Sequence, residues 1–184
     1  MERTLIKNAI LVNEGRLLES DLLIEDEFIA RIDRDISDPN ARVIDASGRY
    51  LLPGLIDDQV HFREPGLTHK GDIASESRAA VAGGITSYME QPNTMPQTTS
   101  IERLEEKFAL ASRSSYANYS FLFGGTNDNL EEIKRLDKKS CSGVKLFLGS
   151  STGNMLVDDE GVLEKIFSNT EMVISAHCED EGTI

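Results

Sequence analysis

The sequence predicts an α/β protein containing the first part of a (β/α)8 barrel, preceded by a small β-rich segment. Up to residue 52, short apolar runs are separated by turn residues, whereas from residue 53 apolar runs of strand length alternate with stretches of helical period. About five strands fit this pattern, against the eight in about 250 residues that a complete barrel needs. Polar side chains lie near the carboxyl ends of these strands, where barrel enzymes place their active sites.

Residues 1–52 are the predicted N-terminal part of a small β domain. The apolar runs are residues 5–6, 9–12, 22–24, 28–32 and 41–44, and the turns between them are residues 13–15, 25–27 and 47–48. Short apolar runs between clusters of turn residues are typical of strands in a β layer. Residues 53–184 are then the predicted first part of the barrel domain.

Five near-continuous apolar runs are the predicted parallel strands: residues 55–62, 85–91, 119–123, 143–149 and 172–178. Such runs are typical of strands covered on both faces. Predicted helices lie near residues 70–82, 100–113, 130–136 and 162–167. Thr99 with Glu102 fits a capping box, and Gly83-Gly84 fits a helix stop. An open doubly wound sheet is the alternative fold, because about five strands could complete one.

The composition excludes several functional classes. Of the 184 residues, 39% are apolar, which is enough for a buried core, while 32 acidic against 19 basic residues give a formal charge of −13. That charge repels nucleic acid and anionic membranes. The N-terminus lacks the features of a signal peptide, so we expect a cytoplasmic protein in which Cys141 and Cys178 are reduced thiols.

The first predicted strand ends in a group of polar residues. A strand period of two points Gln59, His61 and Arg63 to the same side. A neutral imidazole is a good ligand for zinc and related ions, and a guanidinium offers a planar fork for a carboxylate. A structural histidine and a surface arginine are the alternative interpretation of this stretch taken alone.

Lys145 lies inside the apolar run 143–149. Burial of an unpaired ammonium is costly and lowers the lysine pKa, which frees the amine for chemistry. Such an amine could add carbon dioxide to give a carbamate, whose two oxygens could bridge two metal ions. The alternative is a lysine that reaches solvent from an edge strand.

Three further residues complete the candidate set. His177 ends the fifth predicted strand and is a second candidate metal ligand, while Asn93 follows the second strand. Cys178 is expected to pack as a thiol on the opposite face from His177. His69 lies at the start of a predicted helix and is expected to be structural or exposed.

Taken in order, these motifs resemble those of dihydroorotases, metal-dependent cyclic amidohydrolases of pyrimidine biosynthesis. The matching stretches are residues 57–66, 91–94, 143–147, 149–153 and 176–180. Residues 45–48 and 51–54 are similar to the segment that leads into the barrel throughout the amidohydrolase superfamily. The match runs the length of the chain.

The resemblance implies a TIM barrel of the metal-dependent amidohydrolase type that binds zinc, as one or two divalent ions. It implies His61 and His177 as metal ligands, carbamylated Lys145 as the bridging catalytic group, and Arg63 and Asn93 as ligands of the substrate carboxylate. The implied reaction is the reversible hydrolysis of dihydroorotate, a small-molecule substrate, to N-carbamoyl-L-aspartate. The other expected partners are the missing C-terminal half of the barrel and further copies of the protein in a homo-oligomer.

Two features depart from the family pattern. Gln59 stands where dihydroorotases usually carry the first histidine of His-x-His, which is expected to weaken or remove one metal position. The later metal-binding histidine and the general acid/base aspartate are expected beyond residue 184. The isolated chain is therefore expected to be inactive, and either to associate with the rest of the barrel or to aggregate.

Two other functions stay open. Allantoinases and dihydropyrimidinases share the fold and the metal chemistry, but their substrates lack the ring carboxylate that Arg63 would bind. A non-catalytic dihydroorotase-like protein that binds a partner enzyme would explain Gln59. Decayed sites usually lose several groups, however, and the other candidate site residues are all present.

Overall fold

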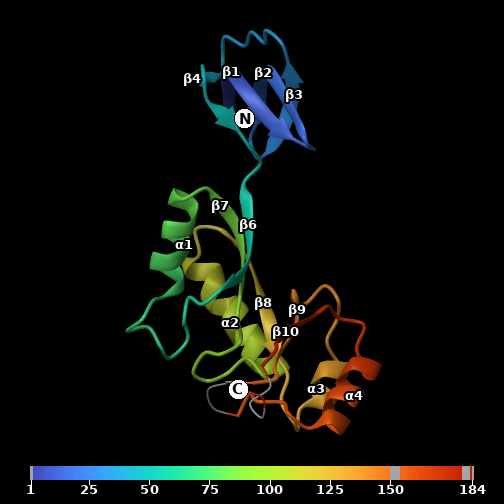
Figure 1. Cartoon of the computed structure of the whole chain (residues 1–184). Helices are drawn as coiled ribbons and strands as arrows, with labels where there is room; N and C mark the ends of the chain where they lie inside the picture. The colour runs from blue at the N-terminus through green and yellow to red at the C-terminus, as the bar shows by residue number, and fades with distance from the viewer. Residues whose placement is uncertain (1, 150–153, 180–182, 184) are drawn as a thin grey trace. The chain divides into compact units, whose positions relative to one another are not determined.

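A computed structural model describes residues 2–149, 154–179 and 183. The chain divides into two compact units, Met1–Gly54 and Leu55–Ile184 (Figure 1). Within the described ranges, every helix is too short or too polar to span a bilayer.

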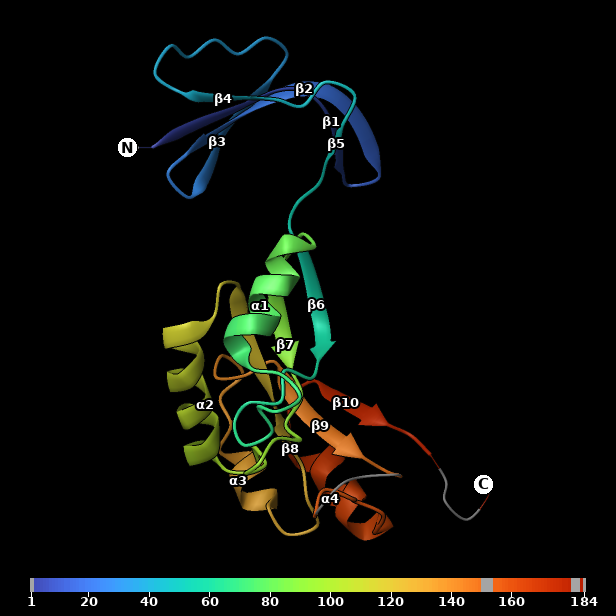
Figure 2. The same cartoon turned by 90° about the vertical axis from the view of Figure 1, so that its left-hand side faces the viewer.

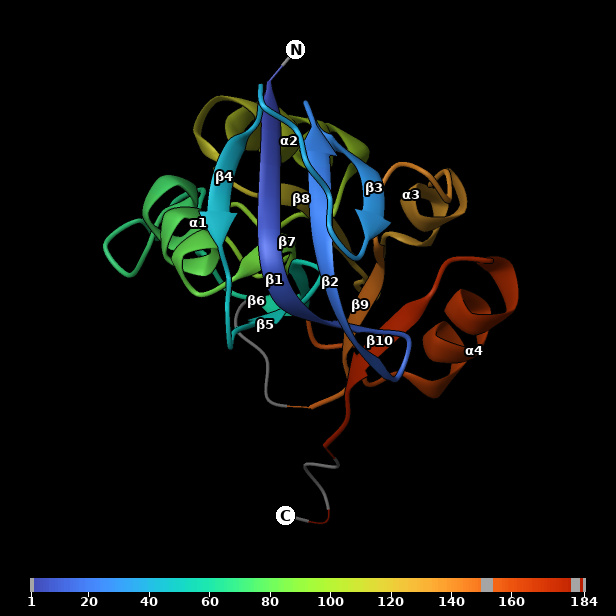
Figure 3. The same ribbon diagram turned by 90° about the horizontal axis from the view of Figure 1, so that it is seen from above.

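The first unit is a five-stranded sheet. Its strands are β1 (Arg3–Asn13), β2 (Arg16–Glu25), β3 (Phe28–Asp33), β4 (Arg42–Asp45) and β5 (Tyr50–Leu51). The order is β3-β2-β1-β4, with β5 paired to β1 (Figure 3). Glu14 and Gly15 turn β1 into β2 with φ of 49° and 70°, the two positive values that a tight hairpin of this type needs. The β1–β2 register shifts between Ile6 and Ala9, where Asn8 has a φ of 59°.

Both faces of this sheet bury small apolar clusters. One cluster contains Ala9, Leu11, Leu22 and Ala46, and the other contains Leu5, Leu23 and Ile36. Leu22 and Leu23 are neighbours on β2 and serve opposite faces, because strand side chains alternate.

The second unit is a parallel sheet whose strands alternate with helices. In chain order the elements are β6 (Leu55–Val60), α1 (Ile73–Ala82), β7 (Ile85–Glu90), α2 (Ile101–Ser114), β8 (Asn118–Gly124), α3 (Leu130–Lys134), β9 (Gly143–Phe147), α4 (Glu160–Asn169) and β10 (Ile174–His177). The strands pair in the order in which the chain forms them (Figure 2). A doubly wound sheet reverses its order at a switch point, so that alternative is wrong. Sequential parallel strands confirm the first part of a (β/α)8 barrel.

The core of the second unit lies between the sheet and the helices. Strands β8 and β9 contribute Phe121, Phe123, Val144 and Leu146, and the helices contribute Ile73, Leu104, Ala111, Ile133 and Ile166. Because side chains alternate along a strand, Lys145 and Phe147 point to the other face of β9, away from this core. The packing therefore places Lys145 on the face that would form the barrel interior.

The helix ends confirm one capping prediction and correct another. Helix α1 ends before Gly83 and Gly84, as predicted, and Gly84 has a φ of 92°. The predicted cap at Thr99 is wrong, because Ser100 is the N-cap of α2 and its Oγ accepts the N–H of Arg103 at 3.3 Å. Threonine and serine can both cap a helix. Ser100 does so here because it has extended backbone directly before the first helical turn.

Candidate active site

His61 and Asn93 meet where β6 and β7 end. His61 Nδ1 lies 2.9 Å from Asn93 Oδ1. An Nδ1–H donated to this oxygen leaves Nε2 with the lone pair that a metal ion requires. Burial lowers the pKa of His61, and the charges of Arg63 and Lys145 act in the same direction. The site therefore favours the neutral imidazole, the form that binds metal.

Arg63 is placed by its backbone rather than by strand alternation. Regular strand structure ends at Val60 and Arg63 has a φ of 73°, so the prediction that the alternation continues to Arg63 is wrong. Its N–H donates to Glu90 Oε1 at 2.9 Å. This bond holds the loop after β6 against the end of β7.

The loop after β6 also packs closely against the loop after β7. The N–H of Met95 donates to the carbonyl oxygen of Pro65 at 3.0 Å. A Cβ added to Gly66, whose φ is 83°, would lie 1.9 Å from the carbonyl oxygen of Met95. Only glycine fits this approach.

Arg63 and Asn93 line the same cavity, which has a volume of about 500 Å³. The other lining residues are Leu67, Lys70, Thr94, Met95, Pro96, Gln97 and Asn154. The described lining thus contains two cationic side chains and no carboxylate, in a chain whose formal charge is −13. The cavity suits an anionic ligand. Lys70 was not predicted from the sequence, where its only signal is its position in the loop that carries Arg63.

Lys145 is buried in the middle of β9, with 4% of its surface exposed. Strand β9 lies between β8 and β10, so the interpretation of Lys145 as a solvent-reaching lysine on an edge strand is wrong. Among the described residues, its ammonium has no hydrogen-bond or ion-pair partner, and the ring centroid of Phe147 lies 5.3 Å from Nζ. Burial lowers the pKa of Lys145, which favours the neutral amine.

His177 ends β10 in register with Phe147. Their ring centroids are 6.3 Å apart, and His177 Nε2 lies 3.3 Å from Glu179 Oε2. Phe147 is two residues from Lys145 and shares its face of β9, so His177 and Lys145 both approach the same ring.

The remaining sequence predictions have mixed outcomes. His69 is exposed, in agreement with one of its expected roles. Cys178 is exposed, so the expectation of a packed thiol is wrong; it lies just past the last paired residue of an edge strand. Residues 150–153 and Asp180, which complete two of the sequence motifs, lie outside the described residues.

The donor set fits a divalent ion only if Lys145 takes part. Within residues 2–149, 154–179 and 183, no three His, Cys, Asp or Glu side chains converge as a metal site would require. His61 and His177 would supply two imidazoles, and Lys145 would supply an amine whose burial favours the neutral state needed for carbamylation. A lysine carbamate would add the missing oxygen ligands.

A buried ion pair that the sequence did not predict lies beside the site. Lys107 Nζ, on α2, lies 3.0 Å from Glu90 Oε2, and the two side chains are 1% and 0% exposed. The same Nζ donates to the carbonyl oxygen of Gln91 at 3.0 Å. A signal existed in the sequence, because Lys107 falls on the helical face formed by Leu104 and Ala111.

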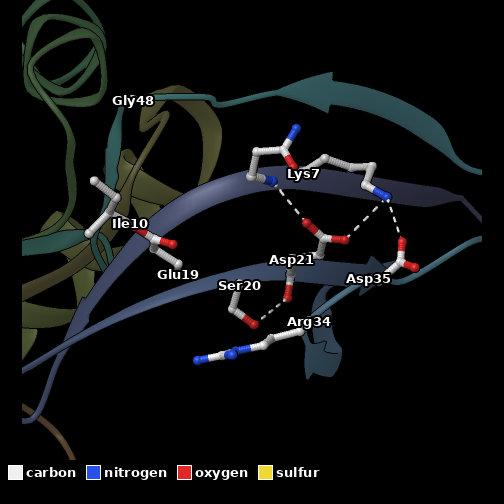
Figure 4. Close-up of a pocket in the computed structure, with 9 residues that line it drawn as sticks. Lys7, Ile10, Glu19, Ser20, Asp21, Arg34, Asp35 and Gly48 are labelled. Carbon is white, nitrogen blue, oxygen red and sulfur yellow. Dashed lines mark hydrogen bonds and ion pairs between the residues drawn. The ribbon is translucent and has the colours of Figure 1, made fainter.

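The first unit holds a cavity of about 590 Å³, shown in Figure 4. Three of its charged side chains pair with one another: Lys7 Nζ lies 3.3 Å from Asp21 Oδ2 and 3.4 Å from Asp35 Oδ1. Asp21 also accepts the N–H of Asn8 at 2.8 Å. These contacts maintain the fold of the unit, so the candidate site is the strand-end region of the second unit.

Comparison with known families gives a consistent result. The model of the dihydro-orotase-like family matches residues 48–184. A dihydroorotase of Methanosarcina acetivorans is 34% identical over 96% of this chain and 38% of its own length. An L-hydantoinase of Paenarthrobacter aurescens is 33% identical over 98% of this chain and 41% of its own length. The chain spans about two fifths of the length of these relatives.

Solved structures agree with this result. The structure of an L-hydantoinase (dihydropyrimidinase) from Arthrobacter aurescens matches 99% of this chain and 42% of its own, with a TM-score of 0.91 and 32% identity. A D-hydantoinase structure matches 96% of this chain with a TM-score of 0.79 and 26% identity. The parallel strands and helices of the second unit are thus arranged as in cyclic amide hydrolases.

Proposed function

The chain belongs to the dihydroorotase-like family of cyclic amidohydrolases, and from that premise we propose that its parent protein is a dihydroorotase. The reaction is the reversible hydrolysis of dihydroorotate. Water adds to the ring amide carbonyl, the C–N bond breaks, and the released nitrogen takes a proton to give N-carbamoyl-L-aspartate.

The cavity that contains Arg63 and Asn93 carries this proposal. Arg63 pairs with the ring carboxylate of the substrate, Asn93 donates its amide N–H to the same group, and Lys70 adds a second positive charge. His61 Nδ1 lies 2.9 Å from Asn93 Oδ1. A substrate carboxylate bound by Asn93 therefore sets the substrate ring beside His61, a candidate metal ligand. The role of these side chains is to orient the amide.

His61, His177 and a carbamylated Lys145 would hold zinc or another divalent ion, as one or two metals. When bound, the metal supplies activation of water and polarisation of the amide carbonyl. Burial excludes the water that would stabilise the charged form of Lys145. It therefore favours the neutral amine, which is the form that reacts with carbon dioxide. Gln59, an exposed residue with only a weak amide ligand, is expected to limit the second metal position.

A hydantoinase or dihydropyrimidinase activity is the second candidate function. The TM-score of 0.91 to the L-hydantoinase structure favours it, because the backbone of this chain fits that enzyme closely. The substrate carboxylate decides between the two functions, since only dihydroorotate would use the charge of Arg63.

The test uses a protein of the relatives' length that contains this chain. Dihydroorotate hydrolysis is followed by ultraviolet absorbance, metal content is measured on the same sample, and dihydrouracil and hydantoin serve as substrates without a carboxylate. We expect activity on dihydroorotate that Lys145→Ala abolishes and Arg63→Met lowers by at least about a hundredfold, since a desolvated charge pair is lost.

The other outcomes are equally informative. Activity on hydantoin or dihydrouracil that Arg63→Met leaves unchanged would assign a sister amidohydrolase. No activity on any of these compounds in a folded, metal-loaded protein would leave the non-catalytic interpretation.

A further inference from the structure

We propose that Glu90 is a positioning residue for Arg63: its carboxylate, whose charge Lys107 balances, holds the Arg63 backbone and so sets the geometry of the carboxylate-binding cavity. The inference rests on the proposed function, because it concerns how that function's substrate is held. Neither residue lines the cavity, so both would act through the backbone of the two strand ends that border it.

Glu90 connects two parts of the fold through its two carboxylate oxygens. Oε1 accepts the N–H of Arg63 at 2.9 Å, and Oε2 lies 3.0 Å from Lys107 Nζ. Glu90 is the last residue of β7, Lys107 belongs to α2, and Arg63 follows β6. One carboxylate therefore holds the loop after β6 to both a strand and a helix.

The backbone at Arg63 needs this support. Its φ of 73° is left-handed, a region that is unfavourable for a long side chain and is maintained by surrounding contacts. A buried carboxylate is a strong acceptor for the Arg63 N–H, and no water competes for it because Glu90 is fully buried.

Lys107 makes this acceptor possible. Burial raises the pKa of Glu90 and lowers that of Lys107, while each charge favours the ionised form of the other. Lys107 also binds the carbonyl oxygen of Gln91, two residues before Asn93. The ammonium thus balances the charge of the carboxylate that holds Arg63, and it also contacts the end of β7.

The test is a pair of double variants that differ in one property. Glu90→Gln with Lys107→Met removes both buried charges but keeps an amide oxygen that can accept the Arg63 N–H. Glu90→Leu with Lys107→Met removes the charges and also the acceptor. Neither leaves a buried charge unpaired, which is the main reason for a single variant to unfold.

Two readouts are taken on a protein of the relatives' length. In the variant Glu90→Leu with Lys107→Met we expect KM for dihydroorotate to rise about tenfold, with kcat and metal content little changed. A tenfold rise is the effect of one lost hydrogen bond to a charged group. In the variant Glu90→Gln with Lys107→Met we expect KM to stay within about threefold of wild type. Equal KM values in the two variants, or a loss confined to kcat, would overturn the proposal and leave the pair a structural role only.

The second readout is hydrogen exchange at the Arg63 amide, followed by NMR, and it does not depend on activity. We expect slow exchange in the wild-type protein and in the variant with Glu90→Gln, and exchange at least about tenfold faster in the variant with Glu90→Leu. Fast exchange in the wild-type protein would overturn the proposal even if both variants failed to fold. If no dihydroorotate is hydrolysed but the exchange pattern holds, the proposed substrate is wrong and the positioning of Arg63 stands.

Discussion

The two units use the same device, a buried carboxylate that accepts the N–H of a residue with positive φ. In the first unit, Asp21 accepts the N–H of Asn8, whose φ is 59°. In the second unit, Glu90 accepts the N–H of Arg63, whose φ is 73°. Both carboxylates hold the backbone in a conformation that needs support from outside the local sequence.

The two carboxylates differ in how their charge is stabilised. Burial raises the pKa of Asp21, but the N–H groups of Asn8 and Ile36 and the ammonium of Lys7 outweigh it, so the pKa is lowered overall. Burial also raises the pKa of Glu90, and there Lys107 and the backbone N–H groups do not outweigh it. Lys7 is partly exposed whereas Lys107 is buried. The carboxylate of Asp21 is therefore held by two backbone hydrogen bonds and a partly exposed cation, whereas that of Glu90 depends on a buried cation.

Lys107→Met should have the largest effect. It leaves the carboxylate of Glu90 buried without a cation, and we expect the second unit to lose about 3–5 kcal/mol of stability. Native-state hydrogen exchange of β7 and β8, read by mass spectrometry, measures this change, and the added substitution Glu90→Gln should restore most of it. If Lys107→Met alone destabilised the second unit no more than the double variant does, the carboxylate of Glu90 would not depend on its cation.

Asp21→Ala should have the next largest effect. It leaves the N–H groups of Asn8 and Ile36 without their acceptor, and we expect a loss of about 2 kcal/mol in the first unit. Exchange of the β1 and β2 amides measures it. Asp35→Ala, at an exposed neighbour of the same lysine, is the matched control and should change little.

Acidification should change the stability of the two units differently. The lowered pKa of Asp21 means that its contribution is present above its unfolded pKa and is lost as the pH falls through the lower, folded value, so β1 and β2 should lose protection below about pH 4. Burial raises the pKa of Glu90, so this carboxylate has no lowered pKa whose stabilisation would be lost over the same pH range. Exchange measured between pH 3 and 6, after correction for intrinsic rates, tests this; parallel loss in both units would refute the assignment.

Lys7→Met should have the smallest effect. Asp21 keeps two backbone N–H donors, and solvent reaches the position that the ammonium leaves. We expect no resolved change in the exchange of β1 and β2. A loss as large as that of Lys107→Met would show that exposure does not explain the difference between the units.

The sequence by itself determined the order and type of the elements. Strand and helix periods are local properties, and they place β6 to β10 and the helices between them within a few residues of their observed bounds. The same runs locate His61, Asn93, Lys145 and His177 at strand ends or within a strand, because a polar residue that interrupts an apolar run is visible without knowledge of its neighbours.

The tertiary structure alone decided which polar groups meet. The contact between Arg63 and Glu90 joins residues 27 positions apart, and the left-handed backbone at Arg63 follows from that contact rather than from its own residue type. The burial of Lys107 on an otherwise apolar helix face likewise requires the carboxylate of Glu90 on β7. The free energy of a buried charge is set by the partner that the fold brings to it, and the spacing of residues along the chain does not contain that information.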